Sequence, residues 1–383
     1  MTWEAWVAIG ALVLAGCAVV IAVVVLRRLR ELRLKVAADA AAAEGDASDA
    51  EPAEPRLVAF IANPSKPDVA AARGEILRAA AEIGLTTPLW LETTVEDPGI
   101  GQAREAVRRG ADVVVAVGGD GTVRAVAEAL AGTKVAMGIV PVGTGNLLAR
   151  NLDLPLGDPA AALRIALEGS DRAIDVGWLR VLRDGSVEDD VTAAAVRTPP
   201  PTPEASRDHI FLVIAGVGFD AAMIADTDDD LKARVGWIAY FVSGVRHLHG
   251  RRLRVTVRLD DAPPETLRLR SLLVGNCGRL PGGLTLLPDA LIDDGWLDVA
   301  AIDTRGGIAG WAQLFGEVML QGAGMRNDLP GKIGRIDHTR AQEVRVVVQG
   351  GEHVQVDGDI VGKVTELSAR VDPAALVVRV PTV

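Results

Sequence analysis

The chain has 383 residues, a length that favours two folded domains with additional segments over one compact core. Apolar and aromatic residues make up 49% and charged residues 24% of the sequence, so the chain as a whole is neither disordered nor fibrous. The formal charge of −11 and the aromatic content of 3% argue against a nucleic-acid partner, which needs a basic face and stacking side chains. Two cysteines, Cys17 and Cys277, support neither a disulfide framework nor a cysteine-rich metal site, and they indicate a reducing compartment.

The first predicted element is a transmembrane helix at residues 5–26. This stretch carries no charge and is long enough to cross about 30 Å of hydrocarbon as a helix. A signal peptide would begin with basic residues, whereas Glu4 is the only charged residue before this stretch, and no clear cleavage site follows it. A cleaved signal peptide is therefore the weaker alternative. Residues 27–35 carry five basic side chains, and such flanks stay on the cytoplasmic side. We therefore expect a single-pass protein of the cell membrane whose catalytic part is cytoplasmic.

Two segments are expected to lie outside any core. Residues 27–55 combine the basic juxtamembrane flank with a tether rich in Ala, Asp and Glu, which lacks large apolar side chains. Residues 183–208 contain the run TPPPTP, which neither a helix nor a central strand accommodates. The second segment is predicted to be a disordered surface insertion between strands at 178–182 and 209–215.

Residues 56–176 alternate between strand-like and helix-like patterns. Strands are expected at 57–62, 113–117 and 135–140, and helices at 69–83, 101–110, 123–131 and 159–168. Alternation of this kind predicts an α/β domain in which a parallel sheet lies between two layers of helices.

Residues 177–371 change to a strand-rich pattern. Strands are expected at 178–182, 209–215, 252–259, 266–276, 296–302, 344–349 and 353–359, with a C-terminal strand within 372–383. The sequence therefore predicts a second, mainly β domain after the α/β domain.

Three polar loops follow the predicted parallel strands. They read NPSKP at 63–67, GGDGT at 118–122 and VGTGN at 142–146. In an open parallel sheet the ligand crevice lies outside the carboxyl ends of the strands, where glycines and a helix N-terminus bring backbone N–H groups to a phosphate. An aspartate in such a loop repels bare phosphate, so Asp120 suits a site that also uses a metal ion. A tight turn explains any one of these loops, but three at successive strand ends favour a nucleotide site.

The motifs resemble those of the diacylglycerol kinase catalytic-domain family, which also includes sphingosine and ceramide kinases. VGGDGTVRAV at 117–126 and PVGTGNLLARNL at 141–152 carry most of the resemblance, and NPSK precedes them. Further matches are GVGFDA at 216–221, PDALIDDG at 288–295 and VDGD at 356–359. The motifs follow the order of the family, and the chain is identified as a bacterial, membrane-anchored member. NAD kinases share the GGDGT loop and are the relatives most easily confused with it.

The resemblance implies transfer of phosphate from ATP, with Mg²⁺, to a hydroxyl of a membrane lipid that arrives from the bilayer. Diacylglycerol is the first expectation, ahead of sphingoid bases and ceramide. Position by position, the resemblance implies that the nucleotide is bound by Asn63, Pro64, Ser65, Lys66, Pro67, Thr93, Gly118, Gly119, Asp120, Gly121, Thr122, Gly143, Thr144 and Asn146.

The resemblance also implies catalytic residues and a second metal ion. Asp120 would organise the Mg²⁺ of the nucleotide. The family carries its general base in an Asp-Gly-Glu triplet, which here reads Asp357-Gly358-Asp359, so Asp359 would be the base and Asp357 its support. A separate, structural Mg²⁺ would be held by one carboxylate and two main-chain carbonyls, those of Asp294, Leu291 and Trp296.

Two departures from the family pattern leave alternatives open. Asp359 is one methylene shorter than the usual glutamate, so it must lie closer to the acceptor hydroxyl or act through water. Leu147 stands where some bacterial members have an aspartate. The alternatives are an NAD kinase-like enzyme and a catalytically idle, membrane-tethered nucleotide-binding protein. The oligomeric state stays open between a monomer and a homodimer.

Overall fold

The computed structural model describes residues 57–85, 87–185, 207–218, 252–280, 285–304 and 334–382. Three predicted segments lie outside these residues and stay predictions. They are the transmembrane helix at 5–26, the juxtamembrane segment and tether at 27–55, and most of the insertion at 183–208. Within the described part of the chain, no helix combines the length and the apolar character that a membrane crossing requires.

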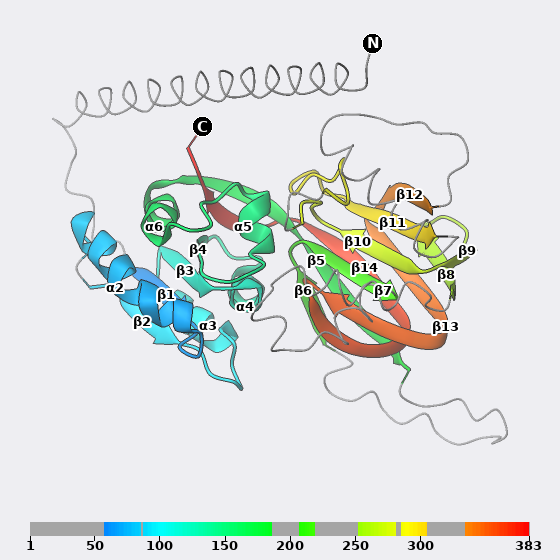
Figure 1. Cartoon of the computed structure of the whole chain (residues 1–383), viewed down its shortest axis with the longest axis horizontal. Coiled ribbons are helices and arrows are strands. Elements are labelled where there is room, and N and C mark those ends of the chain that lie inside the picture. The colour runs from blue at the N-terminus through cyan, green and yellow to red at the C-terminus, as the bar shows by residue number, and fades with distance from the viewer. Residues whose placement is uncertain are drawn as a thin grey trace, which may run out of the picture. The chain divides into compact units, whose positions relative to one another are not determined.

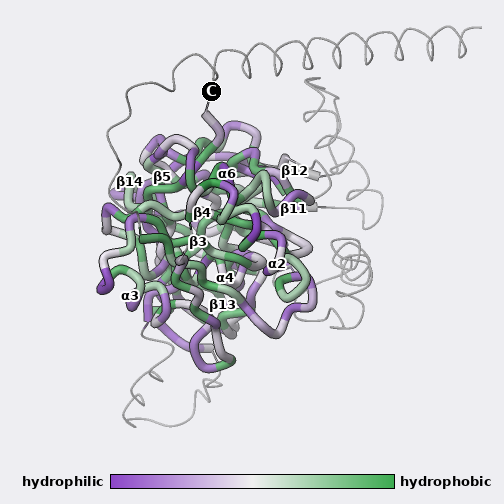
Figure 2. Tube along the Cα trace, turned by 90° about the vertical axis from the view of Figure 1, so that its left-hand side faces the viewer, coloured by the Kyte–Doolittle hydropathy of each residue, from purple (hydrophilic) through white to green (hydrophobic). Residues whose placement is uncertain are grey.

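Four parallel strands form the first half of the sheet (Figure 1). β1 (Val58–Ala62) lies between β2 (Leu89–Glu92) and β3 (Val113–Gly118), and β4 (Ala136–Pro141) follows β3. β3 and β4 are buried along their whole length and run through the hydrophobic interior in Figure 2. Continuous apolar runs of this kind are typical of parallel sheets that are covered on both faces.

Helices cover both faces of these parallel strands. α2 (Pro67–Glu82) and α6 (Pro159–Glu168) pack on one face, and α3 (Ile100–Arg108) and α4 (Asp120–Leu130) pack on the other. Alternate side chains of β1 enter the two layers, because successive residues of a strand point to opposite faces. The three-layer arrangement that the alternating sequence pattern predicts is confirmed.

The rest of the sheet is largely antiparallel, so the fold is α/β with a mixed sheet. Its strands are β5 (Ser170–Asp184), β6 (Asp208–Phe211), β7 (Ile214–Gly218), β8 (Leu253–Leu259), β9 (Glu265–Leu269), β10 (Ser271–Gly275), β11 (Leu297–Thr304), β12 (Gly334–Ala341), β13 (Glu343–Val356) and β14 (Asp359–Val380). In the described residues, the main path of the sheet runs β12-β11-β10-β7-β13-β14-β4-β3-β1-β2.

β14 joins the two halves of the sheet (Figure 1). It pairs in antiparallel fashion with β13 and β5, and near its end Val378 lies opposite Met137 of the parallel strand β4. Leu376 and Val378 are fully buried in the core that α3 and α4 also line. The C-terminal strand predicted within 372–383 is thus the end of a longer strand, and Arg56–Val383 form one compact unit.

Two of the expected strands are divided in the structure. The segment 209–215 becomes β6 and β7, and the segment 266–276 becomes β9 and β10. Each break allows the chain to change partners, because β6 pairs with β5 whereas β7 pairs with β10 and β13. Similarly, β9 pairs with β8, whereas β10 pairs with β7 and β11.

Because the end of β14 belongs to the core of the parallel half, we expect Leu376→Ala to lower the free energy of unfolding by about 2–5 kcal/mol. Leu182 is 41% exposed, so Leu182→Ala should change this free energy by no more than about 0.5 kcal/mol. Urea unfolding of the full chain in detergent micelles, followed by circular dichroism, measures both. Equal effects of the two substitutions would contradict the assignment of the C-terminal residues to this core.

Candidate active site

The predicted nucleotide loops meet at one edge of the parallel sheet. β1, β2, β3 and β4 run in the same direction, so their carboxyl ends all lead to this edge. Backbone hydrogen bonds join neighbouring loops. The N–H of Thr93 donates to the carbonyl of Ala62 at 2.9 Å, and the N–H of Val142 donates to the carbonyl of Gly118 at 3.0 Å.

The first loop is a tight turn at the protein surface. Asn63 Oδ1 accepts the N–H of Ser65 at 3.0 Å, and Pro67 then begins α2. The remaining predicted residues differ in exposure: Thr93, Gly118, Thr122 and Asn146 are buried, whereas Pro64, Ser65, Lys66, Pro67, Gly121, Gly143 and Thr144 are exposed. The edge therefore presents both exposed side chains and buried polar groups.

The second and third loops touch through their backbones. A Cβ atom on Gly143 would lie 2.7 Å from Cα of Gly119, which is closer than any side chain tolerates. A Cβ atom on Gly145 would lie 2.4 Å from Oδ2 of Asp120. A larger residue at 143 would push the two loop backbones apart, whereas one at 145 would displace the carboxylate of Asp120.

The carboxylate of Asp120 holds the third loop in place. Its Oδ2 accepts the N–H of Asn146 at 2.9 Å, and its Oδ1 accepts the N–H of Leu147 at 2.5 Å, where α5 (Leu147–Asn151) begins. Asn146 has a left-handed φ of 49°, and its side-chain amide donates to the carbonyl of Gly143 at 2.6 Å. Asp120 thus links the start of α4 to the start of α5.

Burial is the largest reason that the pKa of Asp120 is raised, to about 6. The negative charge of Asp357 raises the pKa further, whereas the N–H groups of Leu147 and Asn146 lower it. A carboxylate in this state gains from an additional cation, because a positive charge nearby favours its ionised form.

The two aspartates of the Asp-Gly-Asp turn lie in different surroundings. Asp357 is buried, and its carboxylate accepts the N–H groups of Leu212 at 2.7 Å and of Val213 and Ile214 at 2.9 Å each. Burial raises the pKa of Asp357, and these three N–H groups oppose that rise. The side chain of Asp359 is 60% exposed. Asp357 therefore fixes the segment between β6 and β7, and Asp359 faces the solvent.

Arg124 connects this turn to the helix that follows the second loop. Its Nη2 lies 2.5 Å from Oδ2 of Asp359, and its Nη1 donates to the carbonyl of Val356 at 2.6 Å. Gly121 borders the same carboxylate, since a Cβ atom there would lie 4.0 Å from Oδ2 of Asp359. The residues predicted to hold phosphate and the predicted base therefore belong to one site.

Arg124 is a site residue that was not predicted from the sequence. Arg124 lies within the VGGDGTVRAV motif at 117–126, but its partners lie more than 230 positions along the chain. The spacing of four residues from Asp120, which places both side chains on one side of α4, is a further signal in the sequence.

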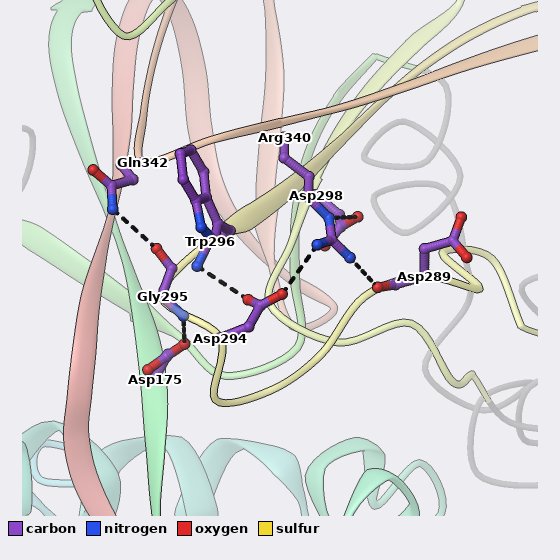
Figure 3. Close-up of polar contacts among 8 residues, drawn as sticks. All are labelled: Asp175, Asp289, Asp294, Gly295, Trp296, Asp298, Arg340 and Gln342. Atoms are coloured by element: carbon purple, nitrogen blue, oxygen red, sulfur yellow. Dashed lines mark hydrogen bonds and ion pairs between the residues drawn. The ribbon is translucent and has the colours of Figure 1, made fainter.

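The predicted ligands of the second metal ion lie at a separate turn (Figure 3). Oδ1 of Asp294 accepts the N–H of Trp296 at 3.1 Å, and Oδ2 of Asp294 lies 3.2 Å from Nη1 of Arg340. The side chains of Leu291 and Trp296 are exposed. Among the residues that the structure describes, no three or more His, Cys, Asp or Glu side chains are grouped as metal ligands.

Since Asp357 satisfies three backbone N–H groups, we expect Asp357→Ala to lower the free energy of unfolding by about 3 kcal/mol or more. Asp359→Ala removes a solvent-exposed ion pair and should cost less than about 1 kcal/mol. Urea midpoints of the two full-length variants, compared with that of the unchanged chain, measure the difference. A midpoint for Asp357→Ala as high as that for Asp359→Ala would show that the carboxylate does not hold the β6–β7 segment.

Comparison with known proteins supports the resemblance that the motifs indicated. The diacylglycerol kinase catalytic domain matches residues 58–179, and the YegS C-terminal NAD kinase beta sandwich-like domain matches residues 213–380. A diacylglycerol kinase of Mycobacterium tuberculosis is 31% identical over 280 residues, which are 72% of this chain and 79% of that protein. The probable lipid kinase YegS-like of Pseudomonas aeruginosa is 31% identical over 283 residues, which are also 72% of this chain and 79% of that protein.

The fold has a counterpart among solved structures. The crystal structure of a diacylglycerol kinase from Bacillus anthracis superposes with a TM-score of 0.62 at 20% sequence identity, and the match covers 86% of this chain and 98% of that one. From the two domain matches and the M. tuberculosis relative, we conclude that the chain belongs to the diacylglycerol kinase catalytic-domain family and is a lipid kinase.

Proposed function

We propose that the protein transfers the γ-phosphate of ATP, with Mg²⁺, to a hydroxyl of a membrane lipid, and that this lipid is diacylglycerol. The observation that carries the proposal is the contact between Arg124 and Asp359, because it holds an exposed carboxylate beside the GGDGT loop at 118–122. The name of the M. tuberculosis relative supports diacylglycerol as the acceptor.

The nucleotide would bind along the edge formed by the strand-end loops. α4 begins at Asp120 with Gly119 as its N-cap, and the N–H groups at a helix start favour phosphate. The backbones at 118–122 and 143–146 would therefore bind the phosphates. The first loop at 63–67 and Thr93 lie at the same edge and would line the rest of the nucleotide.

The residues at this edge also fit a magnesium ion that arrives with the nucleotide. Asp120, Asp357 and Asp359 gather negative charge around Arg124, which repels a triphosphate unless a divalent cation accompanies it. Oδ1 of Asn146 is buried and has no hydrogen-bond partner in the described part of the chain. Asp120 and Asn146 supply oxygen ligands of the kind that Mg²⁺ prefers, and the ion would neutralise charge on the phosphates.

In the reaction, Asp359 would accept the proton of the lipid hydroxyl. The hydroxyl oxygen forms a bond to the γ-phosphorus while the bond from that phosphorus to the bridging oxygen of ADP breaks, and the proton passes to the Asp359 carboxylate. Arg124 is a positioning residue in this scheme, because it holds both the carboxylate and the carbonyl of Val356. The exposure of Asp359 allows the lipid to approach a side chain that is shorter than the family's glutamate.

The location of the reaction follows from the sequence. An anchor at 5–26 with a cytoplasmic basic flank at 27–35 would keep the kinase at the inner face of the cell membrane. A lipid acceptor accounts for such an anchor, whereas the soluble acceptor of an NAD kinase does not. Such an anchor would therefore favour the lipid over the dinucleotide.

The function is tested by following the label from γ-labelled ATP with Mg²⁺, using the full chain in mixed micelles. Separate reactions contain diacylglycerol, sphingosine, ceramide or NAD. We expect label in the organic phase with diacylglycerol, and a loss of about 100-fold to 10,000-fold in kcat for Asp359→Asn, because the general base is removed. Asp261→Asn, in an exposed turn between β8 and β9, serves as the matched control and should retain full activity.

Other outcomes of this experiment separate the alternatives. Label on sphingosine or ceramide alone would replace the acceptor but keep the lipid kinase mechanism. Label on NAD alone would reject the lipid acceptor. Measurable ATP binding without transfer to any acceptor would support the catalytically idle protein.

Because the pKa of Asp120 is raised to about 6, we expect the affinity for ATP with Mg²⁺ to fall as the pH drops through about 6. Above this pH the carboxylate is charged and accepts the N–H groups of Asn146 and Leu147, whereas below it the protonated group loses charge and an acceptor. Binding titrations of the full chain over a pH series measure the effect.

The nucleotide's own terminal phosphate also titrates near pH 6, so the comparison between variants decides this prediction. Asp120→Asn should bind ATP with Mg²⁺ more weakly at neutral pH, and its affinity should lack the additional fall at acidic pH. Asp359→Asn should retain this additional fall in affinity. An unchanged decline in Asp120→Asn would assign the pH dependence to another group.

A further inference from the structure

The guanidinium of Arg340 lies in the middle of the acidic turn at 289–298 (Figure 3). Its Nη2 donates to the carbonyl of Asp289. Its Nη1 lies 3.2 Å from Oδ2 of Asp294, and its Nε donates to Oδ1 of Asp298 at 3.3 Å. One side chain therefore contacts oxygen atoms from three different points of the turn.

Other groups hold the backbone of this turn. Asp175 is buried, and its carboxylate accepts the N–H of Gly295 at 2.6 Å and the N–H of Ala374 at 2.7 Å. Oδ1 of Asp294 accepts the N–H of Trp296 at 3.1 Å. After these bonds, Oδ2 of Asp294 and Oδ2 of Asp298 are buried without a hydrogen-bond partner among the described residues, and Arg340 lies beside both carboxylates.

Two carboxylates and a main-chain carbonyl are the ligands that a hard divalent cation uses. Here they surround a guanidinium. Asp298 is 5% exposed, and its Oδ2 has no hydrogen-bond partner among the described residues, so its charge depends on compensation from nearby. The neighbouring Asp293 is already paired with Arg172 at 2.8 Å.

We infer that Arg340 is a built-in counter-ion that takes the place of the structural Mg²⁺ implied at Leu291, Asp294 and Trp296. Oδ1 of the Asp294 carboxylate accepts a backbone N–H group, whereas Oδ2 is buried, has no hydrogen-bond partner among the described residues and lies 3.2 Å from Nη1 of Arg340 as an ion pair. A divalent ion bound to this carboxylate would lie close to the positive charge of Arg340, and like charges repel. The turn therefore keeps its fold without a metal ion. This inference is independent of the proposed reaction, whose magnesium belongs to the nucleotide edge.

The first test compares melting temperatures of the nucleotide-free full chain in detergent micelles, with Mg²⁺ and with a chelator. The unchanged chain should melt at the same temperature in both. Arg340→Ala should melt a few degrees lower in chelator, because two carboxylates then lack compensation. It should regain part of the loss with Mg²⁺, which binds the exposed oxygen atoms, and adding Asp294→Asn should abolish that recovery.

The second test uses Tb³⁺ as a luminescent probe ion, with the indole of Trp296 as the local sensitiser. Each chain is compared with the same chain carrying Trp296→Phe, so that emission from other tryptophans cancels. In the chain with Arg340, emission should not depend on Trp296. In Arg340→Ala, emission that depends on Trp296 should appear, and Mg²⁺ should reduce it.

Several results would overturn the inference. One is emission that depends on Trp296 and is displaced by Mg²⁺ in the chain that retains Arg340. A second is a rise in melting temperature with Mg²⁺ in that chain which Asp294→Asn abolishes. A third is an Arg340→Ala variant with an unchanged melting temperature and no response to metal. Should Arg340→Ala fail to fold, the Tb³⁺ comparison on the chain with Arg340 decides the question alone.

Discussion

The course of β14 (Asp359–Val380) is the constraint on which the arrangement of the site depends. The strand begins at Asp359, directly after the turn that follows β13, and near its end it pairs with β4, whose carboxyl end leads into the third polar loop at 142–146. A single extended segment therefore spans from the candidate base to the sheet that carries the candidate phosphate loops. Arg124 adds a second, local connection between the same two parts. A carboxylate positioned by a strand and a helix is held more firmly than one on a free loop.

Buried and partly buried carboxylates act in this fold mainly as anchors for irregular backbone. Asp120 binds the N–H groups at the start of α5, Asp175 binds those of Gly295 and Ala374, and Asp357 binds three N–H groups between β6 and β7. Loops and strand breaks leave backbone N–H groups without a partner in the sheet, and a buried N–H group needs one. A buried carboxylate with two acceptor oxygens meets that need at a cost in desolvation, which is visible in the raised pKa values of Asp120 and Asp357. The fold thus uses aspartate to shape the site as well as to carry its chemistry.

Much of the parallel half of the fold could be predicted from the sequence. The apolar runs that become β1, β3 and β4 are bounded by glycine, proline or asparagine, and the helix predicted at 159–168 coincides with α6. That the loops at 118–122 and 142–146 lie together could be predicted from the parallel strands alone, because the carboxyl ends of such strands share one edge of the sheet. β2 was missed because it has only four residues. The extent of β14 was missed because Pro373 and Gly362 suggest breaks, which the structure accommodates with irregular pairing near these residues.

Side-chain roles were harder to predict than elements, because they depend on contacts between distant residues. The segment 209–215 has the composition of one strand, and its division at Leu212 and Val213 coincides with the N–H groups that Asp357 binds. The sequence does not distinguish Asp357 from Asp359, since both flank one glycine, and only the fold buries the first and exposes the second.

The two acidic turns that the sequence marked out share one feature in the structure. The Asp-Gly-Asp turn meets Arg124 from α4, and the turn at 289–298 meets Arg340 from β12. In both cases the guanidinium contacts a main-chain carbonyl as well as a carboxylate, so it fixes the path of the backbone and balances charge together. The planar guanidinium of an arginine can make both contacts at once, whereas a lysine presents a point charge.

The two turns differ in whether a carboxylate stays accessible to a substrate. At the first, Asp359 keeps an exposed carboxylate that can meet a substrate. At the second, Asp298 is buried and the guanidinium of Arg340 contacts three acceptor oxygen atoms, which suits a structural element and not a reacting centre.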